Sequence, residues 1–104
     1  AGHSGDAGLS AYAASKGALA AASKSIAVEY GRRNITVNCV APGTIDTDAV
    51  TKIPDARQVE IKHAIPLRRY GKPEEVAALV AFLASEQASY INGQQILIDG
   101  GLIR

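Results

Sequence analysis

The sequence predicts an α/β fold, in which short parallel strands alternate with helices, and three features support this prediction. Residues 11–30 are rich in alanine, the strongest helix former. Residues 35–40 and 95–98 are short apolar runs of the kind that form buried strands. Between them, residues 73–85 carry apolar side chains at helical spacing. Strands that alternate with helices pair in parallel through helical crossovers, so both runs are expected in one sheet.

The composition is that of a soluble globular protein. The chain has 104 residues, of which 47% are hydrophobic and 20% charged, with a formal net charge of +1. Such a balance gives no reason to expect a nucleic-acid or membrane partner. The single cysteine, Cys39, suits a reducing compartment, and no segment is typical of a membrane span or signal peptide. We therefore predict a cytoplasmic protein in which Cys39 is a small buried hydrophobe.

The first helix is expected at residues 11–30, after a glycine-rich loop at residues 1–9. Ser10 suits the N-cap position, and Gly31 follows the last periodic residue, where glycine commonly ends helices. Several faces of this helix carry small or apolar side chains, which favours burial on more than one side. We expect it to cover the sheet and to pack against a second subunit, the alternative being a central helix of one domain.

The middle of the chain contains one long stretch, residues 44–70, without clear periodicity. Ala41-Pro42-Gly43 is expected to end the strand before it. Because long irregular segments in compact domains often serve as lids, residues 44–70 are interpreted as a substrate lid with one short helix at residues 55–64. Pro73, at the first helical position, then begins the second helix, and Asp99-Gly-Gly101 closes the last strand.

Tyr12 and Lys16 are the strongest candidates for chemistry. They stand four positions apart, so on a helix they lie on one face, one turn from each other. A nearby ammonium favours the phenolate form of a phenol and so helps it to transfer protons near neutral pH. The spacing therefore suits a tyrosine general acid assisted by a lysine, although chance pairs at this spacing are common on helices.

Further motifs accompany this pair in a fixed order. They are Asn34-Ile-Thr-Val-Asn-Cys-Val-Ala-Pro-Gly-Thr-Ile-Asp-Thr47, Gly71-Lys-Pro-Glu-Glu-Val-Ala77, Tyr90-Ile-Asn-Gly93 and Ile98-Asp-Gly-Gly101. The set resembles the second half of the classical short-chain dehydrogenase/reductase family, within it the 3-oxoacyl-[acyl-carrier-protein] reductase branch, over essentially all of the chain. The resemblance implies the C-terminal part of a Rossmann-type doubly wound parallel sheet. It also implies an NAD(P)-dependent oxidoreductase that transfers hydride reversibly between nicotinamide and a carbonyl or secondary alcohol.

The resemblance assigns roles to individual residues. Tyr12 would be the catalytic acid and base, and Lys16 would assist it while binding the nicotinamide ribose. Besides Tyr12 and Lys16, the cofactor, NAD or NADP, would be contacted by Pro42, Gly43, Thr44, Ile45 and Thr47. These residues follow the carboxyl end of a predicted strand, where open α/β sheets bind ligands. Gly43 in addition has no side chain to keep a planar ring at a distance.

Other polar residues receive simpler interpretations. Asn38 is expected to tie its strand to a loop. Arg33 either complements the negative end of the first helix or matches the arginine that holds the acidic partner in the acyl-carrier branch. His3 and His63 have no further ligands at metal-binding spacing, so no metal site is predicted.

The resemblance implies a homotetramer with a small carbonyl or alcohol substrate and with acyl carrier protein as a further partner. A 3-oxoacyl thioester is the first substrate prediction, and a sugar, polyol or other small alcohol is the alternative. Lys16 and the Pro-Gly-x-x-x-Thr run disfavour the halohydrin dehalogenases and the extended nucleotide-sugar epimerases, respectively. Outside catalysis, the alternative is an inactive fragment that serves only in assembly.

We expect residues 1–104 to be an excerpt, the C-terminal half of one NAD(P)-binding domain. The sequence has no Met, no glycine-rich phosphate loop after a strand, and too few strands for a stable sheet. The catalytic serine of the family, and the residues that choose between NAD and NADP, would precede Ala1. In isolation the chain is therefore expected to be neither stably folded nor active.

Overall fold

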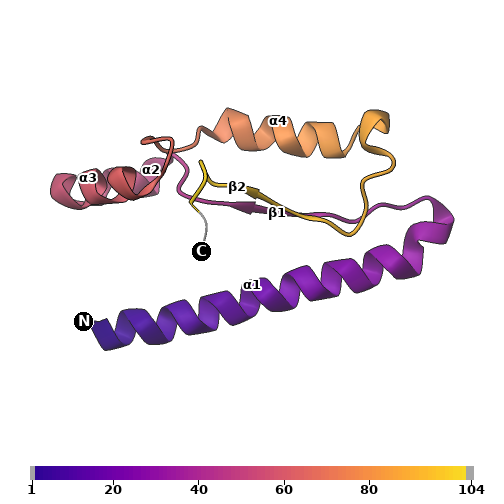
Figure 1. Cartoon of the computed structure of the whole chain (residues 1–104), viewed down its shortest axis with the longest axis horizontal. Helices are drawn as coiled ribbons and strands as arrows, with labels where there is room; N and C mark the ends of the chain where they lie inside the picture. The colour runs from indigo at the N-terminus through magenta and orange to yellow at the C-terminus, as the bar shows by residue number, and fades with distance from the viewer. Residues whose placement is uncertain (1, 103–104) are drawn as a thin grey trace. The chain divides into compact units, whose positions relative to one another are not determined.

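The computed structural model describes residues 2–102 of the chain, with side chains from residue 10 onward. Helices and strands alternate, which confirms the α/β class (Figure 1). The chain divides into two compact units, which we call the first unit (Ala1–Cys39 with Tyr90–Gln95) and the second unit (Val40–Ser89 with Ile96–Arg104). In chain order the elements are α1 (Gly2–Tyr30), the 3-10 turn η1 (Gly31–Arg33), β1 (Cys39–Pro42), α2 (Asp48–Thr51), α3 (Asp55–Ala64), α4 (Pro73–Leu83), the 3-10 turn η2 (Glu86–Ala88) and β2 (Gln95–Ile98).

β1 and β2 pair as a two-stranded sheet. The Cys39 N–H donates to Gln94 O at 2.8 Å, and the Gly43 N–H donates to Ile98 O at 3.0 Å. Because both residue numbers rise together along the pair, the strands are parallel, as predicted (Figure 1). Pro42 has no backbone N–H to donate. In a parallel pair only every second residue of β1 donates its N–H toward β2, and Pro42 lies between two donors, so it does not interrupt the ladder.

The strand β1 is displaced from its predicted position, whereas β2 occupies the predicted residues 95–98. Residues 35–38 lie outside β1. Next to residues 92–94 their pairing is irregular, because the Gly93 N–H donates to Val37 O at 2.9 Å while the Asn92 and Asn38 side chains accept the N–H groups of Val37 and Gln94. The prediction that both runs form buried strands is wrong for the described chain, because only Ala41 of the two strands is buried. Leu97 is 60% exposed, and Cys39 is half-buried rather than buried.

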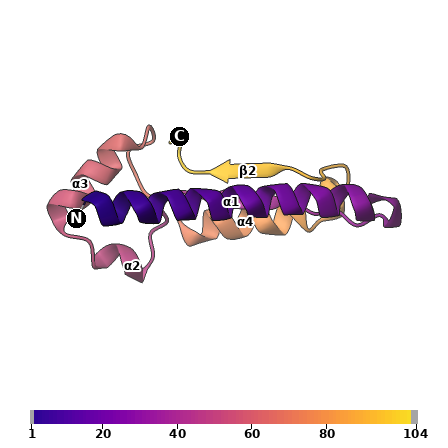
Figure 2. The ribbon, with the colours of Figure 1, turned by 90° about the horizontal axis from the view of Figure 1, so that it is seen from below.

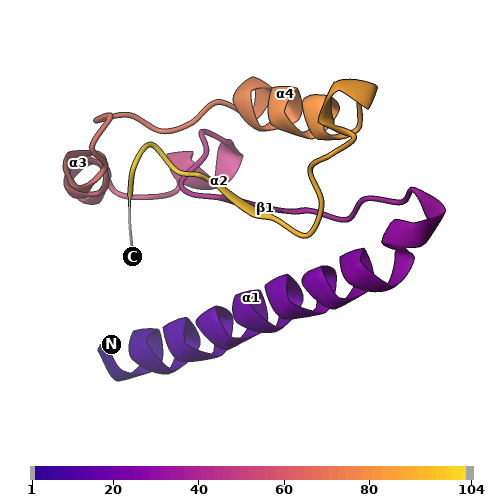
Figure 3. The ribbon, with the colours of Figure 1, turned by 45° about the vertical axis from the view of Figure 1, so that its right-hand side comes forward.

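The helix α1 is longer than predicted. It begins at Gly2, so the predicted loop before residue 10 and the N-cap role of Ser10 are wrong for the residues that the structure describes. Residues 2–9 contain no proline, and glycine weakens a helix by only about 1 kcal/mol, so helical backbone hydrogen bonding continues through them. Figure 3 shows α1 as one unbroken helix.

The end of α1 also differs from the prediction. Gly31 is not the left-handed residue that ends the helix, because Gly31–Arg33 continue as η1. Asn34 takes that conformation instead, with φ of 61°, and its N–H donates to Gly31 O at 3.0 Å. Asparagine tolerates the left-handed region better than most residues, so it can cap in place of glycine.

Two asparagines connect the parts of the first unit. The Asn92 side chain accepts a hydrogen bond from the Val37 N–H at 2.9 Å and donates to Ala27 O at 3.0 Å. The Asn38 side chain both donates to and accepts from the backbone of residues 91–94. The predicted role of Asn38 in tying its strand to a loop is confirmed. Asn92 adds a connection to α1, whose Ala27 is buried while most other described side chains of the helix are exposed.

The second unit contains α2, α3 and α4. Helix α3 spans the predicted residues 55–64, and α4 begins at Pro73, as predicted, and ends at Leu83. Helix α2, Asp48–Thr51, was not predicted, because four residues are too few to show helical periodicity. Both α2 and α3 lie beyond the carboxyl ends of the strands (Figure 2).

The core of the second unit is formed by Val50, Ile65 and Tyr70, with Ile61 packed against it. All four residues lie within residues 44–70, the stretch interpreted as an irregular lid. The stretch is therefore an ordered part of the fold with its own apolar contacts. Periodicity did not reveal it, because these contacts join two short helices and a loop rather than one face of a single helix.

Candidate functional site

Tyr12 and Lys16 lie one turn apart on α1, as their spacing predicted. The Lys16 Nζ lies 4.6 Å from the centroid of the Tyr12 ring, so the ammonium is placed over the aromatic face. A cation in this position is attracted to the ring. The two side chains are thus held together on one helix, with Tyr12 54% exposed.

This pair offers a phenol proton beside a positive charge. No hydrogen bond joins the Tyr12 hydroxyl to another residue of the described chain, so the hydroxyl is free to donate to an external acceptor. A phenol that releases its proton becomes negative, so a cation held near its ring would favour that step. The arrangement is therefore suited to proton transfer.

Pro42, Gly43, Thr44, Ile45 and Thr47 belong to the second unit, at the end of β1. Pro42 is the last residue of the strand, and Thr47 directly precedes α2. A segment that leaves the carboxyl end of a parallel strand and enters a helix is where open α/β sheets bind ligands.

The absence of a side chain at Gly43 is required by a contact inside the protein. A Cβ atom at this position would lie 2.7 Å from the Asp99 Cβ and 2.9 Å from the Asp99 Cα, which is closer than carbon atoms approach without bonding. The end of β1 therefore packs directly on the turn after β2, which Asp99 holds by accepting the Gly101 N–H at 3.0 Å. The approach of a cofactor ring to Gly43 stays a prediction.

Ile45 presents an unpaired donor and an unpaired acceptor. It forms a parallel bridge with Gly71, in which the Asp46 N–H donates to Gly71 O at 2.8 Å and the Gly71 N–H donates to Thr44 O at 3.0 Å. In such a bridge the central residue turns its own N–H and C=O to the other side. No described residue is hydrogen-bonded to these two groups of Ile45, so a ligand can use both.

The predicted residues thus form two groups. Tyr12 and Lys16 belong to the first unit, and residues 42–47 belong to the second. The structure brings the members of each group together within its own unit.

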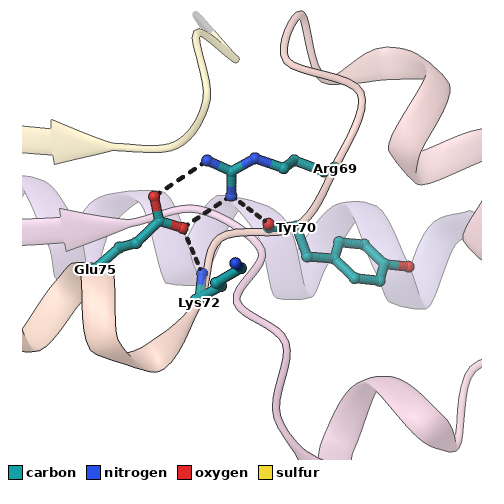
Figure 4. A network of polar contacts seen from close by, with 4 residues as sticks. All are labelled: Arg69, Tyr70, Lys72 and Glu75. Carbon is teal, nitrogen blue, oxygen red and sulfur yellow. Dashed lines mark hydrogen bonds and ion pairs between the residues drawn. The ribbon is translucent and has the colours of Figure 1, made fainter.

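A polar network that the sequence did not single out lies at the start of α4 (Figure 4). Arg69 donates to both carboxylate oxygens of Glu75, at 2.8 and 3.1 Å, and to Tyr70 O at 3.0 Å. Glu75 also accepts the Lys72 N–H at 2.9 Å. A glutamate at the third helical position is a known capping signal and could have indicated this last contact. The pairing with Arg69 joins a loop to a helix and has no such local signal.

The network changes the ionisation of its charged members. The hydrogen bond from Arg69, and after it the hydrogen bond from the Lys72 backbone, lowers the pKa of Glu75 from 4.5 to about 2. The same pairing raises the pKa of Arg69. Both groups are therefore charged at neutral pH, and the bidentate geometry fixes the loop before α4 to its first turn.

Two kinds of feature are absent from the described part of the chain. In that part, no group of three or more His, Cys, Asp or Glu side chains is placed so that it could bind a metal ion. None of the helices described is long and apolar enough to cross a membrane.

Comparison with known proteins identifies the family. The sequence model of the family described as Enoyl-(Acyl carrier protein) reductase matches residues 1–103. The chain belongs to the short-chain dehydrogenase/reductase family. This confirms the family that the motifs indicated.

Curated relatives from this family are similar over almost the whole chain. The 3-oxoacyl-[acyl-carrier-protein] reductase of Rickettsia felis is 49% identical over 102 residues, which are 98% of this chain and 42% of the relative. The enzyme of the same name from Thermotoga maritima is 48% identical over 99 residues, covering 95% and 40%. Nodulation protein G of Rhizobium sp. is 48% identical over 101 residues, covering 97% and 41%. The chain thus spans about two fifths of the length of these relatives.

Two solved structures share the fold. An NADPH-dependent reductase involved in bacilysin biosynthesis aligns with a TM-score of 0.77 and 48% identity, over 85% of this chain and 37% of that chain. A 4-hydroxyisoleucine dehydrogenase complexed with NADH aligns with a TM-score of 0.82 and 36% identity, over 89% and 39%. The parallel strands and helices described above are accordingly part of the Rossmann-type fold of short-chain reductases.

Proposed function

We propose that this chain provides the proton-transferring residues and part of the cofactor site of an NAD(P)-dependent reductase of 3-oxoacyl thioesters. The observation that carries the proposal is the Tyr12–Lys16 pair, placed one turn apart on α1 with the ammonium 4.6 Å from the ring centroid. Membership of the short-chain reductase family supports a redox role for this pair. The similarity to 3-oxoacyl-[acyl-carrier-protein] reductases supports the substrate class.

The donor set at the end of β1 fits a nicotinamide cofactor. A carboxamide has one carbonyl acceptor and one amide donor, and the unpaired N–H and C=O of Ile45 complement both. Thr44 and Thr47 add hydroxyl groups on the same segment, and Lys16 would bind the ribose. The neighbours named with NADH and NADPH support a dinucleotide in general without choosing between the two.

The chain's own residues would handle the proton. A bound nicotinamide cofactor would supply the hydride, with its two electrons, to the carbonyl carbon. Tyr12 then gives its hydroxyl proton to the carbonyl oxygen, so that the phenol O–H bond breaks as the product O–H bond forms. Lys16 stabilises the resulting phenolate until a proton from solvent restores the phenol.

Residues 44–70 would act as the substrate lid in this scheme, with α2 and α3 as its moving part. Thr47 connects the proposed cofactor segment directly to α2, so movement of the lid helices and binding at residues 44–47 are linked through the chain itself. An acyl substrate delivered by acyl carrier protein belongs to the same proposal, supported by the names of the curated relatives.

Homotetrameric assembly through α1 and α4 is also part of the proposal. It is supported by exposed apolar side chains on these helices, such as Leu19 and Phe82, which are 59% and 42% exposed.

A dehydrogenase of small alcohols is the second candidate function. The observation that favours it is the alignment with the 4-hydroxyisoleucine dehydrogenase at a TM-score of 0.82. The two candidates share the roles of Tyr12 and Lys16 and differ in the substrate that residues 44–70 would accept. Comparing turnover of a 3-oxoacyl thioester with that of small hydroxylated substrates distinguishes them.

The test of the proposal is Tyr12→Phe in the intact protein. We expect the rate of substrate-dependent NAD(P)H oxidation to fall by about 10²–10⁴-fold, because the general acid is lost, while cofactor affinity stays nearly unchanged. Lys16→Ala should lower both the rate and cofactor affinity. Tyr90→Phe and Lys24→Ala are the matched controls, since Tyr90 is fully exposed and Lys24 lies outside the proposed site. A Tyr12→Phe protein that kept a tenth of its rate would disprove the acid–base role.

A further inference from the structure

Tyr70 is fixed by its backbone to the elements that lead into α4. The Arg69 guanidinium donates to Tyr70 O at 3.0 Å while it binds the carboxylate of Glu75 (Figure 4). Because Glu75 belongs to the first turn of α4, the carbonyl of Tyr70 is tied to that helix. Tyr70 therefore cannot follow a movement of α2 and α3 without breaking these contacts.

The next residue along the chain is fixed to the proposed cofactor segment. Gly71 exchanges hydrogen bonds with Thr44 O and the Asp46 N–H, at 3.0 and 2.8 Å. A Cβ here would lie 2.7 Å from the Ile45 Cδ1, so the end of the Ile45 side chain would have to shift to admit one. The backbone of residues 69–71 thus belongs to the same rigid part as residues 44–46.

The side chain of Tyr70, in contrast, contacts α2 and α3. The ring is buried, with 7% exposure, and shares the core with Val50 of α2. Lys62 Nζ of α3 lies 4.9 Å from the ring centroid. In Figure 4 the ring extends away from Glu75, opposite to the contacts of the backbone.

Gln58 links the same ring to both lid helices. The Tyr70 hydroxyl donates to the Gln58 Oε1 at 3.5 Å, at the upper limit for a hydrogen bond. Gln58 Nε2 in turn donates to Val50 O at 3.2 Å and to Ile53 O at 2.9 Å. Since the hydroxyl contact is long, the ring rather than the hydroxyl carries most of the interaction.

We propose that Tyr70 is a positioning residue that docks α2 and α3 onto the segment carrying Thr44 and Ile45, without touching substrate or cofactor itself. This inference rests on the proposed function, because it assigns α2 and α3 the role of the substrate lid. When the lid is docked in only a fraction of the molecules, the apparent Kd for substrate equals the intrinsic Kd divided by that fraction, so apparent affinity is lower. Loss of the Tyr70 ring should therefore raise KM, whereas saturating substrate restores docking and most of kcat.

The experiment compares Tyr70→Leu, Tyr70→Phe and the control Tyr90→Leu in the intact protein. We expect Tyr70→Leu to raise the substrate KM about tenfold, with kcat lowered less than threefold and the cofactor Kd changed less than twofold. Tyr70→Phe keeps the ring and should return KM to within twofold of the wild-type value. Tyr90→Leu should alter none of these quantities, because Tyr90 is fully exposed.

Hydrogen exchange of the same variants, measured without substrate, tests docking independently of turnover. We expect Tyr70→Leu to speed amide exchange in α3 and to leave exchange in α4 unchanged. If Tyr70→Leu does not fold, Val50→Ala weakens the same contact from the lid side and should change KM and exchange in the same direction.

Three results would overturn the proposal: an unchanged KM with unchanged exchange, faster exchange in α3 and α4 alike, or a Tyr70→Phe protein as impaired as Tyr70→Leu. A wild-type protein without reductase activity would instead refute the proposed function, and the exchange measurement would still decide whether Tyr70 docks the two helices.

Discussion

The two units of the chain position their candidate residues in different ways. In the first unit, Tyr12 and Lys16 are placed by the regular geometry of α1. Among the described residues of this unit, Ala27 is the one buried hydrophobic residue. In the second unit, residues 42–47 are placed by tertiary contacts, with Gly43 against Asp99 and Ile45 beside Gly71. A helix transmits position through its own backbone hydrogen bonds, whereas a loop has to be held by its neighbours.

Glycine substitutions give the largest expected difference between the units. Gly43→Ala should lower the free energy of unfolding by about 1–3 kcal/mol, because its Cβ would collide with Asp99. Gly17→Ala should raise it by up to about 1 kcal/mol, since Gly17 has no atom within 4 Å of its Cβ position and alanine favours helices. Urea denaturation of the intact protein measures both changes. Equal changes in the free energy of unfolding at the two sites would show that residues 42–47 do not depend on tertiary contacts more than α1 does.

The asparagine contacts provide a smaller effect inside the first unit. Asn92→Ala leaves the Val37 N–H and Ala27 O without their partner, so we expect a loss of about 1–2 kcal/mol in the free energy of unfolding. Gln94→Ala is the matched control, because its exposed side chain makes one bond, of 3.2 Å, within the same loop. The comparison is again made by urea denaturation. Should both variants lose the same amount, the loop rather than the Asn92 side chain would be the stabilising feature.

The smallest effect is expected from the exposed Arg69–Glu75 pair, and it should depend on pH. The pKa of Glu75 is lowered from 4.5 to about 2 in the folded chain, so its contribution is complete above about pH 4.5 and is lost as the pH falls toward 2. Glu75→Gln should therefore lower the urea midpoint slightly at pH 7 and have less effect near pH 2. High salt should reduce the difference at pH 7, since exposed ion pairs are screened.

The adjacent carboxylate supplies the control for this pH dependence. Glu74→Gln removes a charge from the same helical turn but no hydrogen bond to a described residue. A Glu74→Gln protein with the same pH-dependent loss would show that charge on the first turn, rather than the pairing with Arg69, is responsible.

Local signals in the sequence were sufficient for several elements. Residues 55–64 and 95–98 were predicted with the observed bounds, and Pro73 marked the start of α4. The Tyr12–Lys16 spacing predicted one helical face. Each of these features depends on residues within about four positions of one another, which is the range over which helical and strand patterns act.

Only the tertiary structure decided the features that join distant parts of the chain. The bounds of β1 depend on where β2 lies alongside, as the bond from the Gly43 N–H to Ile98 O at the end of the pair illustrates. The burial of Tyr70 depends on the return of the chain to Val50, and the need for glycine at residue 43 depends on the turn at Asp99. A sequence pattern records the preference of each segment, but it does not record which partner a segment meets, because that is set by packing among all of them at once.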